Sequence, residues 1–160
     1  LGIGAALKWA QREESLRRGV DFIKWTFQPV QSRNAFFNLE KLGAFVKHYE
    51  PNFYGTDYST VGGQTKNSGL DSDRLFAEWH LRSEKVEKLA QGEDFRESGA
   101  IIKRIELRFD WNELVKNDFS RAVAEQTRIK KEFQAAFAEN LICRSFERVG
   151  ENSAYQLFAD

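Results

Sequence analysis

The chain has 160 residues, 41% of them apolar and 14% aromatic, which is enough to bury the core of one domain and argues against disorder. Its 24 basic and 24 acidic side chains balance, so the composition carries no electrostatic signature for nucleic acid or an anionic membrane, and we expect neither as a partner. The only cysteine, Cys143, has no partner for an internal disulfide, and no apolar run approaches the length of a membrane span. We therefore expect a cytoplasmic protein.

Two glycines, Gly2 and Gly4, directly precede a segment of helix-forming residues. Residues 4–18 are predicted to form a helix that ends at Gly19, because the apolar side chains recur on one face. The side chains on this face are Ala5, Trp9 and Leu16. Glycines before a helix let a ligand approach the backbone closely, and the free N–H groups of the first turn attract phosphate.

Residues 20–27, VDFIKWTF, are predicted to form a strand. They are β-branched and aromatic with little alternation, which is typical of a strand buried on both faces in a parallel sheet. A helix over residues 33–42 is expected to follow, with Ser32 as its N-cap and Gly43 at its end.

Two further strands are predicted at residues 44–49 and 74–81, and we expect them to pair antiparallel. The segment between them, residues 55–73, is polar, rich in glycine and without apolar periodicity. A loop of this length inside a compact domain is unusual, so we expect it to be the most mobile internal segment or to have a function.

The second half begins with a charged segment, residues 83–94, which is compatible with a surface helix. A strand at 100–109 follows, and then the longest helix at 119–139, with Asp118 as N-cap and Asn140 as its left-handed C-terminal stop. A closing hairpin is predicted from residues 142–149 and 154–159. The order of the elements predicts an α/β fold with a mixed sheet and flanking helices.

A G-x-G before a helix is also the beginning of the dinucleotide-binding fingerprint G-x-G-x-x-G. That fingerprint requires a small residue where this chain has Leu7, and an acidic residue at the end of the second strand. The residues at that strand end are Trp25, Thr26 and Phe27. A dinucleotide site is therefore not expected here.

The same residues match a different pattern. Gly2-Ile3-Gly4-Ala5 corresponds to the last half of a phosphate loop of the form [Q/R]-x-x-G-x-[G/A], and Ala35 with Glu40-Lys41-Leu42-Gly43 corresponds to a later helix segment, N-x-x-A-x-x-L-Y-E-K-L-G-F. With these motifs the chain resembles the GNAT superfamily of acyl-CoA N-acyltransferases. Residues 25–55 and 70–81 further resemble the branch of predicted GNAT acetyltransferases, and residues 119–158 resemble its C-terminal region.

The resemblance implies a division of the chain and a longer parent protein. Residues 1–82 would form the C-terminal half of a GNAT-like acyl-CoA-binding domain, and residues 83–160 an α+β extension packed on the same sheet. In the family the first strands of the sheet precede the phosphate loop. Because the sequence also contains no methionine, we expect it to be a fragment of a longer protein.

The resemblance also implies the activity and the ligand. The expected reaction is acetyl transfer from acetyl-CoA to the primary amine of a small molecule or peptide, by direct attack of the amine and without a metal. Backbone N–H groups of Gly2, Ile3, Gly4 and Ala5 would surround the pyrophosphate of the co-substrate. The Asn34 amide would either bind the pantetheine arm or satisfy local backbone groups.

The catalytic residues are left unassigned. The tyrosine that the family often uses as an acid would fall at Asn38 or Leu39. Tyrosines that could replace it, or could be packing residues, are Tyr49, Tyr54 and Tyr58. Histidines on the predicted strands that could act as a base, or be structural, are His48 and His80, the latter beside Glu78.

A second class of function is open for the same sequence. If residues 20–27 form a strand with one unpaired edge, the chain could be a non-catalytic remnant or an interaction module. Self-association through the edge of this strand is then expected.

Overall fold

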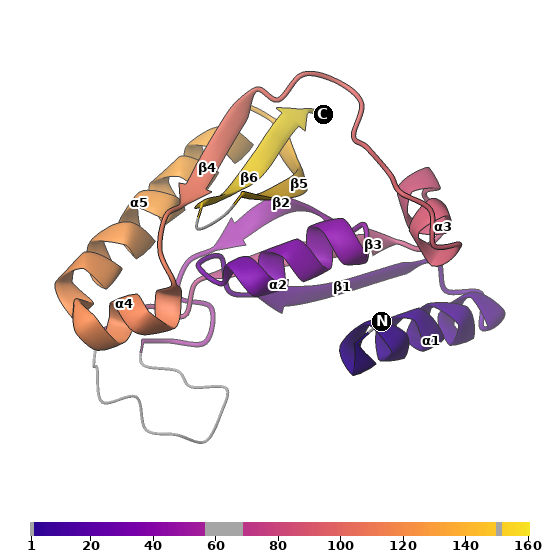
Figure 1. Ribbon diagram of the computed structural model, residues 1–160, viewed down its shortest axis with the longest axis horizontal. Helices are drawn as coiled ribbons and strands as arrows, with labels where there is room; N and C mark the ends of the chain where they lie inside the picture. Colours follow the sequence, from indigo (N-terminus) through magenta and orange to yellow (C-terminus); the bar gives the residue numbers. More distant parts are fainter. Residues whose placement is uncertain (1, 57–68, 150–151) are drawn as a thin grey trace.

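The computed structural model describes residues 2–56, 69–149 and 152–160. Helices are interspersed with the strands of a single sheet along the chain (Figure 1). The elements are α1 (Ile3–Arg17), β1 (Phe22–Phe27), α2 (Ser32–Phe36), the π-helix η1 (Phe37–Lys41), β2 (Phe45–Glu50), β3 (Arg74–His80), α3 (Glu84–Ala90), β4 (Lys103–Leu107), α4 (Trp111–Asn117), α5 (Phe119–Ala138), β5 (Leu141–Val149) and β6 (Asn152–Ala159).

The sheet has six strands in the order β1-β3-β2-β5-β6-β4, and every neighbouring pair is antiparallel. The expectation of a mixed sheet is therefore wrong. β1 and β2 do run in the same direction, but β3 inserts between them and pairs with both. β1 is an edge strand, and residues 20–27 are not buried on both faces as predicted. Ile23 and Trp25 point to the face that α1 covers, whereas Phe22 and Lys24 point to the opposite face and are exposed.

The predicted antiparallel pairing of residues 44–49 with 74–81 is confirmed. Phe45 lies opposite Glu78 and Val46 opposite Ala77, and the register shifts before Tyr49. Of the loop predicted at 55–73, residues 57–68 lie outside the described part of the chain, so the expectation about its mobility stays a prediction.

The helix predicted at 33–42 is present but changes character. Its first turns are the α-helical α2, and its last turn is the π-helix η1, in which Leu42 N–H donates to the Phe37 carbonyl (3.0 Å). Ser32 is not the N-cap, because Gln31 holds that position and makes no side-chain capping bond. Gly43 follows with a left-handed φ of +74°, which confirms it as the stop residue.

Most local predictions for the second half are confirmed. The side chain of Asp118 accepts a hydrogen bond from Arg121 N–H at the start of α5, and Asn140 adopts φ +57° just after its end. β5 and β6 form the closing hairpin. α4 was not predicted, although Asp110, which accepts from Glu113 N–H, is a capping signal in the sequence.

The helices α1, α2 and α5 pack against one face of the sheet. Trp79 of β3 meets Trp9 of α1 with the ring centroids 5.6 Å apart, and its indole N–H donates to the carbonyl of Leu42 (2.7 Å). Tyr49 of β2 meets Phe133 of α5 with centroids 5.7 Å apart. No helix in the described ranges is long and apolar enough to cross a membrane.

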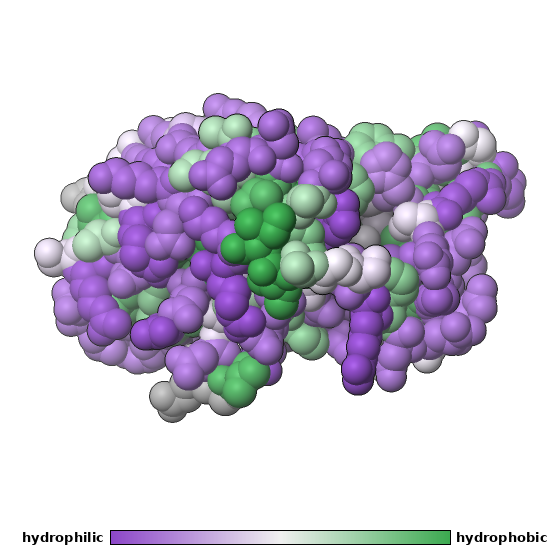
Figure 2. All heavy atoms as spheres, turned by 90° about the horizontal axis from the view of Figure 1, so that it is seen from above, coloured by the Kyte–Doolittle hydropathy of each residue, from purple (hydrophilic) through white to green (hydrophobic). Residues whose placement is uncertain are grey.

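Residues 1–82 and 83–160 contribute to the same sheet and the same core. β2 pairs with β5 at Val46 and Cys143. The Tyr155 hydroxyl of β6 donates to the carbonyl of Pro29 (2.7 Å) in the turn before α2. On the face of the molecule in Figure 2, hydrophilic residues cover most of the surface and a compact hydrophobic patch lies near the centre.

Candidate functional site

The first turn of α1 has the properties of an anion-binding helix end. Gly2 is the N-cap and makes no side-chain capping bond, and the first turn contains no acidic residue. The N–H groups of Ala5 and Ala6 donate to the Gly2 carbonyl (3.0 and 3.1 Å), whereas no acceptor within the described ranges reaches those of Ile3 and Gly4. Two donors and the positive end of the helix dipole are thus available.

The glycines of this turn are not required by the fold. Gly2 has φ −69°, and Gly4 is helical, so neither adopts a backbone conformation that favours glycine. A Cβ atom on Gly2 would meet no atom within 4 Å, and one on Gly4 would meet only the Phe37 ring, at 4.0 Å. Because glycine has no side chain, an external group can approach the backbone closely at these two positions.

The structure brings the start of η1, which continues α2, beside this turn. Phe37, the neighbour of Gly4, begins η1, and Asn34 lies three residues earlier, on the same helix face. Asn34 is exposed, and no side-chain hydrogen bond of Asn34 is found among the described residues. One turn later on this face, the buried Asn38 accepts a hydrogen bond from the Trp25 indole (3.2 Å). We call Gly2–Ala5, Lys8 and Asn34 the α1–α2 site.

Lys8 belongs to this site and was missed from the sequence. It follows Gly4 by four residues, so it lies on the same side of α1. Its Nζ atom is 3.8 Å from the centroid of the Trp25 ring and donates to Gln11 (3.1 Å). No carboxylate in the described part of the chain pairs with Lys8, and burial lowers the pKa of its ammonium group. The four-residue spacing from Gly4 was the available sequence signal.

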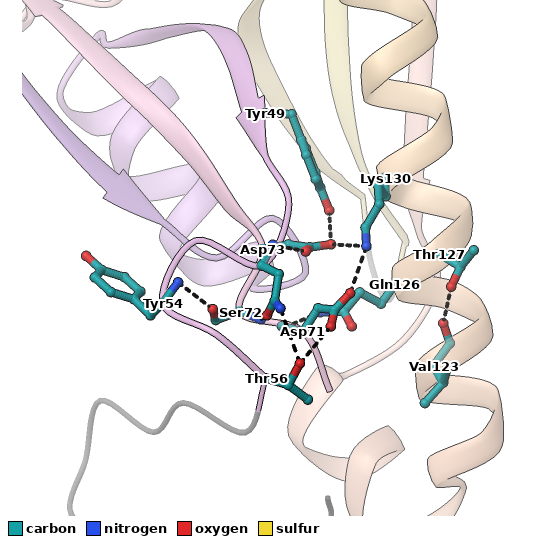
Figure 3. A network of polar contacts seen from close by, with 11 residues as sticks. Tyr49, Tyr54, Thr56, Asp71, Ser72, Asp73, Val123, Gln126, Thr127 and Lys130 are labelled. Atoms are coloured by element: carbon teal, nitrogen blue, oxygen red, sulfur yellow. Dashed lines mark hydrogen bonds and ion pairs between the residues drawn. The ribbon is translucent and has the colours of Figure 1, made fainter. Parts of the chain in front are cut away.

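The tyrosine candidates lie elsewhere. Tyr49 is buried, and its hydroxyl donates to the carboxylate of Asp73 (2.5 Å) (Figure 3). Burial, and then the bond to Asp73, raise the pKa of Tyr49 far above its usual range. This hydroxyl is therefore held protonated as a structural donor, which does not suit an acid acting on an exposed thiolate.

Tyr54 is exposed, and its hydroxyl lies 3.4 Å from the Thr26 hydroxyl of β1. Since Thr26 follows Trp25 in the strand, the two side chains point to opposite faces, and Tyr54 lies on the face away from α1. Tyr58 lies outside the described residues.

The histidines also lie away from the α1–α2 site. His80 stacks on Phe45 with ring centroids 5.3 Å apart, and it follows Trp79, whose ring packs against α1. Alternation along β3 therefore places His80 on the opposite face of the sheet. His48 is within 2.8 Å of Glu50. Neither histidine is brought to the helix end where an acyl-CoA was expected.

Two other features carry no site chemistry. Cys143 is completely buried, and burial raises the pKa of its thiol, so it is an inert core residue. No cluster of metal-ligating side chains occurs in residues 2–56, 69–149 and 152–160. Comparison of the chain with protein-family models, curated protein sequences and solved structures finds no match.

Proposed function

We propose that this chain is part of an acyl-CoA-dependent N-acyltransferase, in which residues 1–82 form a GNAT-like acyl-CoA-binding unit and residues 83–160 an α+β extension. The single observation that supports it most is the uncapped first turn of α1, whose glycines the fold does not require and which lies beside Phe37 of η1. The sequence resemblance supplies the identity of the ligand.

Each residue of the α1–α2 site then has a physical role. The N–H groups of Ile3 and Gly4 hold pyrophosphate oxygens, helped by the helix dipole. Lys8 supplies a positive charge one turn further on, and Asn34 donates to an amide of the pantetheine arm. Acetyl-CoA, when bound, supplies the activated thioester. The chain's contribution is to position it for direct attack by a primary amine.

A thermal-shift titration with coenzyme A tests the binding step. The melting temperature of the wild-type chain is expected to rise with the concentration of coenzyme A, because a ligand that binds only the folded state stabilises that state. Gly4→Val is expected to weaken binding by about tenfold or more, because a β-branched side chain fills the space that the phosphate needs. The variant should fold, since a Cβ at position 4 meets only Phe37 at 4.0 Å.

Leu7→Val is the matched control, because Leu7 is 66% exposed on the same helix and outside the α1–α2 site. Its coenzyme A titration should equal that of the wild type. A wild-type chain that does not respond to coenzyme A refutes the proposal. Transfer itself is measured by release of free thiol from acetyl-CoA with a primary amine, and the burial of Cys143 keeps the background of this assay low.

A non-catalytic interaction module is the second candidate function, and the exposed edge of β1 favours it. Binding of coenzyme A without thiol release would support a remnant that binds but does not turn over. Measurable thiol release by this chain would exclude that alternative.

A further inference from the structure

A hollow of about 270 Å³ lies on strands β4, β5 and β6. It is on the face of the sheet turned away from α5, because its floor residue, Ala154, precedes Tyr155, whose ring packs against Phe133 of α5 with centroids 4.9 Å apart. The strand order puts β4 at one edge of the sheet and β1 at the other (Figure 1). The hollow is therefore separate from the α1–α2 site.

The register of the strands explains why the sheet is hollowed here. Ala154 of the central strand β6 lies directly opposite Glu106 of β4 and Glu147 of β5. Directly opposite residues of antiparallel strands project to the same face, so the short side chain of Ala154 is flanked by two long ones. Ala154 itself is buried beneath its neighbours.

Two ion pairs line the hollow. Arg104 lies opposite Gln156, and its guanidinium reaches across β6 to the carboxylate of Glu147. Arg108 pairs with Glu106 (2.5 Å). All four charged side chains are between 38% and 68% exposed. An ion pair in such surroundings stabilises a protein little, so a ligand can replace one partner of it at low cost.

These charges favour a ligand that carries both signs. The lining holds two guanidinium groups and two carboxylates, so it offers no net charge to a polyanion or a polycation. A guanidinium receives a ligand carboxylate through two parallel hydrogen bonds, and a glutamate receives an ammonium group. Val149, 61% exposed at the rim, adds apolar surface. The volume is just below the roughly 300 Å³ at which pockets for drug-sized molecules begin, which suits a single amino acid.

We propose that this hollow is a binding site for a free amino acid with an apolar side chain. The ligand inserts into the Arg104–Glu147 pair: its carboxylate binds the guanidinium of Arg104, and its ammonium group binds the carboxylate of Glu147. Its side chain lies between Ala154 and Val149. Binding is independent of coenzyme A, because the two sites are on opposite faces of the sheet.

Isothermal titration calorimetry of the full chain with L-leucine, in the absence of coenzyme A, tests the ligand class. Saturable binding is expected with a dissociation constant of about 1 mM or lower. Leucinamide lacks the carboxylate and 4-methylpentanoate lacks the ammonium group, so each should bind at least about tenfold more weakly. Absence of saturation by L-leucine at about 10 mM, or equal binding of either analogue, overturns the proposal.

Two variants test the position of the site. Arg104→Gln removes the cation that receives the carboxylate, and Ala154→Leu fills the hollow, so each should weaken L-leucine binding by about tenfold or more. Lys47→Gln is the matched control, because it breaks a similarly exposed ion pair with Asp160 (3.1 Å) outside the hollow. This control should bind L-leucine as the wild type does.

Wild-type affinity in a folded Arg104→Gln variant, or loss of affinity in Lys47→Gln, overturns the assignment. If Ala154→Leu fails to fold, Arg104→Gln still decides. The response of Arg104→Gln to coenzyme A should equal that of the wild type. Because L-leucine is titrated without coenzyme A, this proposal and the acyltransferase proposal succeed or fail separately.

Discussion

Asp73 shows how a single carboxylate organises the base of the long loop. Its side chain is almost completely buried at the start of β3. It accepts hydrogen bonds from the Tyr49 hydroxyl and from Asn52 N–H (2.8 Å), and it pairs with Lys130 of α5 (3.5 Å). Asp71 binds the same ammonium group (3.0 Å), so strand, turn and helix are fastened at one place (Figure 3).

We predict that Asp73→Asn lowers the free energy of unfolding by about 1–3 kcal/mol, because the amide replaces one acceptor oxygen by a donor that faces other donors. The matched control is Asp110→Asn, the same substitution at the N-cap of α4, where asparagine caps as well as aspartate. Urea denaturation measures both variants. Equal, small changes in the two would show that the Asp73 network contributes little.

At the level of the elements, a side chain of η1 stabilises an irregularity in β5. Glu40 of the π-helix accepts hydrogen bonds from the Ser145 hydroxyl and from Phe146 N–H, both 2.7 Å. These donors lie next to the register shift between Cys143 and Ser145, where a strand loses regular pairing. The Glu40 side chain of the π-helix thus accepts from two donors of β5 at the place where the pairing of the strand is irregular.

The junction of η1 with β2 leads to a second prediction. Gly43 and Gly92 both have left-handed φ angles, +74° and +79°, but a Cβ on Gly43 would lie 3.1 Å from Leu89 and 3.2 Å from Val86 of α3, whereas Gly92 faces open space. Both alanine variants bear the backbone strain of about 1–2 kcal/mol. Gly43→Ala should lose about 1–3 kcal/mol more through overpacking. Thermal unfolding of the two alanine variants measures this difference. Equal losses of stability in both would mean that α3 moves away from position 43 without cost.

For the molecule as a whole, we predict a loss of stability in alkaline solution. Burial raises the pKa of Tyr49, Tyr155 and Cys143 above the ordinary values of 10.0 for tyrosine and 9.0 for cysteine. The folded state therefore retains protons that the unfolded chain loses. This contribution to stability is fully present below about pH 8 and declines as the pH rises through 9 to 11.

Urea unfolding at a series of pH values measures the decline. Tyr49→Phe cannot ionise at position 49, so its free energy of unfolding should fall less steeply above about pH 10 than that of the wild type. The variant is also less stable at neutral pH, because Asp73 loses a donor. Identical alkaline slopes for the two proteins would contradict the assignment to Tyr49.

Local signals in the sequence located most helix ends and turns. Asp118 caps α5 by a bond to an N–H group three residues away, and Asn140 and Gly43 take left-handed conformations at helix ends. Such bonds and conformations involve only neighbouring residues, so a short stretch of sequence is sufficient to predict them. The same holds for the glycines before α1, which marked the candidate site.

The order of the strands and the surroundings of each side chain depended on contacts between distant segments. Backbone groups are the same in every strand, so residues 20–27 alone do not indicate which strand pairs with them. In the structure β3 pairs with β1. The sequence placed Asp73 in a loop, because the three groups that bond to its carboxylate come from distant positions in the chain. Lys8 became part of a site only when folding set α1 against Trp25 and brought Phe37 beside Gly4.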